Sequence, residues 1–262
     1  MSDPSRRWRP ADLLEELGIS EPQDIRLEPI AQFCGATIVY EPLDGCEARI
    51  LGYGDRAIIT INERSPRFRQ RFSGAHELGH WMRDRRQIAF SCTERLLSAE
   101  WGRDNPERRA NRYAAELLLP EALFAPRARN LPIIFDSARS LARQFETSLT
   151  ATAIRLVELG SYPSILVCIE DGRRRWFYPD PDVPRELRPR DDLHVDTVAY
   201  DLLRGGHDAG PTDVCAAGWF DHPAAHRYKI REDSVISSTT GLVLSLLWWE
   251  DECQLIDLAE ED

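Results

Sequence analysis

Residues 69–81 read RQRFSGAHELGHW, and His76, Glu77 and His80 within this stretch form the pattern His-Glu-x-x-His. A Ser-Pro pair at 65–66 and apolar or small residues at helical spacing predict a helix over 66–83. Residues four apart on a helix project from one face, so His76 and His80 can share a metal ion. Glu77 then lies beside them as a base for an attacking water. The stretch therefore predicts a zinc site with hydrolytic chemistry.

A catalytic zinc site takes a third protein ligand, and the pattern itself does not supply it. A second predicted helix begins at an Asn-Pro pair and spans about 106–119, with Glu107 and Asn111 on its apolar face and Glu116 on its polar face. We therefore expect Glu107 to be the third ligand and Asn111 to orient a ligand histidine. Tyr113 is a candidate oxyanion donor. The acidic residues near the motif that are candidates for the third zinc ligand are Glu94, Glu100, Asp104, Glu107 and Glu116.

Two of the six cysteines bear on this site. Cys92 follows His80 by twelve residues, between the two ligand helices. A thiolate binds zinc strongly, so Cys92 is a candidate inhibitory fourth ligand, similar in principle to the cysteine switch of matrix metalloproteases. Cys46 is a weaker candidate for the same role, and a buried structural cysteine is the alternative for both.

The rest of the chain indicates an α+β protein with a small antiparallel sheet and a helical bundle, followed by an α/β domain. Strand Ala57–Asn62 is expected to be the edge along which an extended substrate pairs. The change from predicted helices to predicted strands near residue 160 predicts one domain of residues 1–160 and another of residues 161–262. The predicted helices span 10–18, 24–34, 136–145 and 149–159, and the predicted strands span 36–40, 48–53, 57–62, 165–170, 174–178 and 242–249, the last of them central in its sheet.

The composition excludes several classes of protein. A formal net charge of -11 over 262 residues argues against a general nucleic-acid binder, because contacts to phosphate dominate such binding. No apolar run approaches the roughly 20 residues that a membrane span needs, and no signal-peptide pattern is seen at the N-terminus. We therefore expect a cytoplasmic protein without a membrane partner.

Four stretches in order carry a resemblance to a known family: AIITIN (57–62), RQRFSGAHELGHW (69–81), ERRANRYAAELLLP (107–120) and SLTATAIRLVELG (148–160). Together they resemble the ImmA/IrrE-type zinc metallopeptidases, which are gluzincin-like. The resemblance implies zinc on His76, His80 and Glu107, with Glu77 as the catalytic carboxylate. It also implies a helix-turn-helix transcriptional repressor as substrate, cleaved to derepress a stress or phage-defence operon. The C-terminal part is compatible with the GAF-like sensor fold of some relatives, and single-stranded DNA is one candidate activator.

Two rival functions remain open from the sequence. A peptide deformylase uses a cysteine together with a His-Glu-x-x-His pair, and Cys46 precedes the motif as that order requires. That alternative lacks a glycine-rich companion motif and leaves Glu107 without a role. A regulatory binding module with non-catalytic zinc is the second alternative, although a structural site has no need of the base Glu77.

Overall fold

A computed structural model describes residues 7–84, 89–93, 105–207, 210–237, 241–251 and 253–259, and for residues 84, 89–93 and 259 it describes the backbone alone. The chain divides into two compact units. The first consists of Met1–Phe124 and Ala142–Ser148, and the second of Ala125–Leu141 and Leu149–Asp262. The boundary predicted near residue 160 stays a prediction.

The first unit contains a four-stranded sheet in the order β1-β3-β2-β4. β2 pairs antiparallel with both β3 and β4, but β1 pairs in parallel with β3. The sheet is therefore mixed, and the predicted antiparallel sheet is wrong in this respect. The reason is that β1 is hydrogen-bonded to β3 and not to β2, which follows it in the chain. The chain reverses direction once from β1 to β2 and again from β2 to β3, so β1 and β3 run in the same direction. The strands span Ala36–Glu41 (β1), Cys46–Tyr53 (β2), Arg56–Asn62 (β3) and Ala89–Thr93 (β4).

The strand expected to pair with substrate is an interior strand. β3 has a hydrogen-bonded neighbour on each side, so its backbone groups are already paired and it offers no edge. In the part of the chain that the structure describes, the edges of this sheet are β1 and β4. The prediction of an edge at Ala57–Asn62 is therefore wrong.

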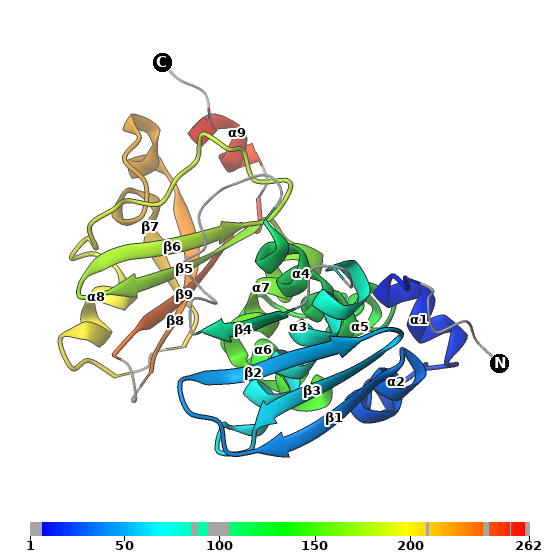
Figure 1. The fold of residues 1–262 in the computed structure, drawn as a ribbon. Coiled ribbons are helices and arrows are strands. Elements are labelled where there is room, and N and C mark those ends of the chain that lie inside the picture. The colour runs from blue at the N-terminus through cyan, green and yellow to red at the C-terminus, as the bar shows by residue number, and fades with distance from the viewer. Residues whose placement is uncertain are drawn as a thin grey trace. The chain divides into compact units, whose positions relative to one another are not determined.

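Helices cover one face of this sheet (Figure 1), where α3 packs on β2 and β3, and α2 packs on β1. Ile59 and Ile61 of β3 and Leu78 of α3 are completely buried there. The β-branched residues of AIITIN therefore both favour the strand and fill the core between sheet and helix. α4 packs against α3 more extensively than any other element does. The helices span Pro10–Glu16 (α1), Leu27–Phe33 (α2), Arg67–Asp84 (α3) and Pro106–Leu118 (α4).

The second unit contains a five-stranded sheet in the order β6-β5-β9-β8-β7, antiparallel throughout. β9 is its third strand, and this confirms the prediction that the apolar run near 242–249 is central. α7 packs on β5 and β6, whereas α8 packs on β8 and β9. The strands span Ser164–Glu170 (β5), Arg173–Pro179 (β6), Thr212–Cys215 (β7), Lys229–Ile236 (β8) and Val243–Trp248 (β9). The remaining helices span Glu121–Ala128 (α5), Phe135–Phe145 (α6), Leu149–Leu159 (α7), Val198–Leu203 (α8) and Cys253–Ala259 (α9), and the residues of α5 and α6 are divided between the two units.

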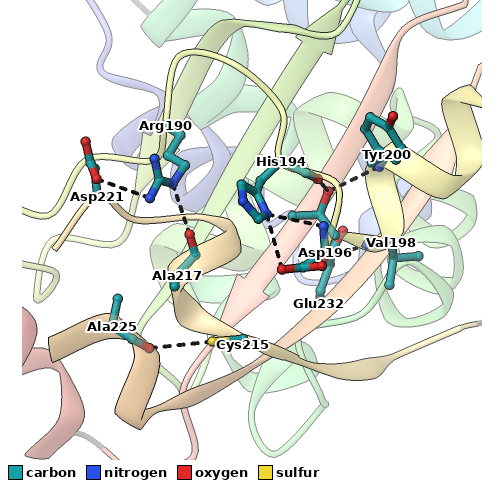
Figure 2. Close-up of polar contacts among 11 residues, drawn as sticks. Arg190, His194, Asp196, Val198, Tyr200, Cys215, Ala217, Asp221, Ala225 and Glu232 are labelled. Carbon is teal, nitrogen blue, oxygen red and sulfur yellow. Dashed lines mark hydrogen bonds and ion pairs between the residues drawn. The ribbon is translucent and has the colours of Figure 1, made fainter. Parts of the chain in front are cut away.

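A buried carboxylate ties α8 to this second sheet (Figure 2). Glu232 of β8 is completely buried and accepts hydrogen bonds from the backbone N–H groups of Val198 and Ala199, at 3.1 and 2.8 Å. The indole of Trp219 and the hydroxyl of Ser234 also donate to it. Burial nevertheless raises the pKa of Glu232, because desolvation of the charged form outweighs these donors. The contacts satisfy the first N–H groups of a short helix, so Glu232 has a structural role.

No helix among the described residues is long and apolar enough to cross a membrane.

Candidate metal centre

The two histidines of the motif lie on one buried face of α3. His76 is 1% exposed and His80 is 7% exposed, and their rings meet edge to face with centroids 4.7 Å apart. Glu77 is 1% exposed. Three polar side chains buried on a single helix face carry a large desolvation cost unless they bind something, so this face is a candidate site.

Glu107 comes to this face from the first turn of α4. Asn105 caps that helix by accepting a hydrogen bond from the backbone N–H of Glu107 at 2.9 Å, and Pro106 occupies the first helical position. The Asn-Pro signal in the sequence therefore fixes the backbone at the residue whose carboxylate faces the histidines. Ala114 and Leu118 on the same face of α4 are buried, which agrees with an apolar face on this helix.

Close approach of the two helices depends on Gly79. A Cβ placed on Gly79 would lie 3.0 Å from Cβ of Tyr113 and 3.1 Å from both Cα and O of Ala110. These distances are shorter than ordinary contacts, and two of the three atoms belong to the backbone. Glycine therefore lets α3 and α4 approach closely enough for residues of both helices to bind one metal ion, despite a cost of about 1 kcal/mol in helix propensity.

Potential metal-binding atoms of three residues converge between α3 and α4. Nε2 of His76 lies 3.1 Å from Nε2 of His80 and 3.2 Å from Oε2 of Glu107. Nε2 of His80 lies 3.4 Å from Oε1 of Glu107. Donors bound to one tetrahedral zinc at about 2.0–2.2 Å stand roughly 3.3–3.6 Å apart, so these separations are close to those that a shared metal requires. Among the described residues, these three form the one group of potential ligands that could hold a metal ion.

The contact with Asn111 indicates which nitrogen of His76 carries the proton. Its Oδ1 lies 2.8 Å from Nδ1 of His76, and an amide oxygen can only accept, so Nδ1 carries the proton. In the neutral imidazole, Nε2 then carries no proton, and its lone pair is directed at His80 and Glu107. Two ring nitrogens and a carboxylate this close together repel unless a proton or a cation lies between them, and the donor set fits a divalent metal.

The other predicted site residues are placed as follows. Tyr113 is 1% exposed in the core of the first unit, and within the described ranges its hydroxyl makes no hydrogen bond. Burial raises the pKa of Tyr113, which remains neutral.

Cys92 lies in β4 with its backbone opposite Ala48, but its side chain lies outside the described part. The rejected ligand candidates Glu94, Glu100 and Asp104 also lie outside the described residues. Cys46 does not belong to the ligand group among the residues that could be searched.

One polar residue on this face of α3 was missed by the sequence reasoning. Ser73 precedes His76 by three residues and Glu77 by four, the spacing of one helix face, yet it is only 3% exposed. The spacing itself was the signal that could have found it. A single serine in a helix is common, however, and only its burial marks it.

Comparison with known proteins agrees with the motifs. Residues 31–157 match the family model of the IrrE N-terminal-like domain, a family of metallopeptidases. This stretch carries the whole candidate ligand group and assigns this part of the chain to the ImmA/IrrE family.

The structure is similar to that of a Mycobacterium tuberculosis transcriptional regulator, with a TM-score of 0.55 and 14% sequence identity, over 91% of this chain and 73% of that one. At this identity the likeness concerns the fold alone. A search of curated proteins finds no match.

Proposed function

We propose that the protein is a zinc-dependent endopeptidase that cleaves a helix-turn-helix transcriptional repressor. The observation that carries the proposal is the convergence of His76, His80 and Glu107, with donor atoms 3.1–3.4 Å apart beside the buried Glu77. Two imidazoles and one carboxylate as ligands, with a second glutamate beside them as a base, are typical of hydrolytic zinc sites rather than of purely structural ones.

The residues divide the work as follows. His76, His80 and Glu107 would hold the ion, and Asn111 holds the ring of His76 in the tautomer whose Nε2 is unprotonated and can bind a metal. Zinc bound there would supply Lewis acidity, which lowers the pKa of a water and polarises the scissile carbonyl. Glu77 takes a proton from the attacking water onto its carboxylate and delivers it to the leaving amine. Burial of Glu77 keeps bulk water away from that proton transfer.

The substrate and the regulation extend this proposal. Family membership supports a repressor as substrate, whose cleavage would derepress a stress or phage-defence operon. The antiparallel sheet of the second unit would serve as a GAF-like sensor, and single-stranded DNA is one candidate activator. An extended substrate segment would pair with an edge strand, β1 or β4, because β3 is interior.

The test is to incubate the purified, zinc-loaded chain with a candidate helix-turn-helix repressor from the same organism, with and without single-stranded DNA. Parallel reactions contain a zinc chelator or the Glu77→Gln variant. We expect one cleavage product that disappears in both controls. A Glu77→Gln protein that still binds zinc and repressor separates lost chemistry from lost folding. Equal cleavage by this variant, or no cleavage by the wild type in any condition, would contradict the proposal and favour the binding module.

A further inference from the structure

The buried serine on the ligand face of α3 has no structural explanation. Ser73 is 3% exposed, and in the ranges that the structure describes its hydroxyl has no hydrogen-bond partner. A buried hydroxyl without a partner costs about 1–3 kcal/mol relative to a satisfied one. Alanine has better helix propensity and would remove this cost, so packing alone favours alanine over serine here.

Helix geometry places this hydroxyl in the candidate metal centre. With 3.6 residues per turn, His76, Glu77 and His80 project within about 60° of the direction of Ser73 around the axis of α3. Side chains on a helix lean back toward its N-terminus, so the carboxylate of Glu77 lies over the turn that contains Ser73. Ser73 is therefore one turn below Glu77, on the same buried face.

We propose that Ser73 is a positioning residue for Glu77. Its hydroxyl donates a hydrogen bond to one carboxylate oxygen of Glu77 when substrate is bound, and this leaves the other oxygen to take the proton from the attacking water. Catalytic hydrogen bonds are often unformed without substrate and form in the complex. The inference rests on the proposed peptidase function, because Glu77 needs a fixed orientation only if it moves a proton.

The experiment compares Ser73→Ala and Ser73→Thr with a matched control, Ser164→Ala. Ser164 in β5 is also completely buried with an unpartnered hydroxyl in the described part of the chain, but it lies in the second unit. For each full-length variant we would measure the midpoint of urea unfolding, zinc affinity by competition with a chromogenic chelator, and kcat and KM for repressor cleavage. Ser73→Ala should unfold at an equal or higher urea concentration than the wild type, with zinc affinity unchanged.

The same variant should lose about 10- to 100-fold in kcat with little change in KM, as expected for one lost hydrogen bond to a charged group. Ser73→Thr should retain most of the activity, and Ser164→Ala should cleave like the wild type. Wild-type kcat in Ser73→Ala, a lower urea midpoint, or a rise in KM at constant kcat would each overturn the inference, the last in favour of a substrate contact. A wild type that cleaves nothing overturns the peptidase proposal itself, so the two failures are distinguishable.

Discussion

Replacement of Gly79 by alanine tests whether the contact between α3 and α4 sets the geometry of the ligand group. Gly79 is adjacent to the candidate ligand His80, and the atoms it approaches belong to Ala110 and Tyr113 in the helix that carries Glu107. The new Cβ would lie 3.0–3.1 Å from three atoms of that helix, where ordinary contacts begin near 3.4 Å. Since two of these atoms are backbone, the helices must separate by a few tenths of an ångström.

Two opposing terms determine the effect on stability. Alanine gains about 1 kcal/mol over glycine in helix propensity, whereas overpacking of a core contact costs about 1–3 kcal/mol. We therefore expect the metal-free variant to lose between about 0 and 2 kcal/mol of unfolding free energy. The effect on zinc should be more specific, because a shift of α4 moves Glu107 away from both histidines, and we expect zinc affinity to fall by about tenfold or more.

Gly74→Ala is the matched control on the same helix. A Cβ at Gly74 would lie 2.7 Å from Cδ1 of Ile61 and 3.4 Å from Cδ1 of Leu27, and these are ends of side chains that can rotate. This variant gains the same propensity but does not press on α4, so its zinc affinity should stay close to that of the wild type. Urea unfolding and competition with a chromogenic chelator measure both quantities. If Gly79→Ala binds zinc as tightly as Gly74→Ala, the close contact does not set the ligand spacing.

Three further predictions concern single side chains. Asn111→Ala removes the acceptor that fixes the tautomer of His76, so zinc affinity should fall about 10- to 100-fold in the same chelator assay, and an unchanged affinity would refute the orienting role. Tyr113→Phe removes a buried hydroxyl without a hydrogen bond among the described residues, so repressor cleavage and the urea midpoint should be retained, whereas an oxyanion donor would cost about 10²–10³ in kcat. Burial raises the pKa of Cys168 to about 11, so in native protein at pH 8 maleimide should label the exposed Cys253 and leave Cys168 unlabelled, and early labelling of Cys168 would contradict its burial.

The local signals in the sequence were sufficient for most helices of the first unit and for the ligand pattern. Ser65-Pro66 and Asn105-Pro106 start helices whose periodicity continues to their ends, and the structure has them at Arg67–Asp84 and Pro106–Leu118. Such signals depend on neighbours within one or two turns, so the amino-acid order specifies them directly. The sequence analysis missed β4, β7 and β8 and the helices α5, α8 and α9, because elements without clear periodicity are stabilised mainly by their partners.

What the sequence determined by itself was the chemistry: two histidines and a glutamate on one helix face, and a second helix with a carboxylate in its first turn. Only the tertiary structure decided that β3 is interior, that Gly79 brings the helices into contact, and that Ser73 and Glu77 are both buried. The physical reason is the range of the interactions. Periodicity and capping act within a few residues, whereas strand order, helix separation and burial depend on segments that are distant in the chain.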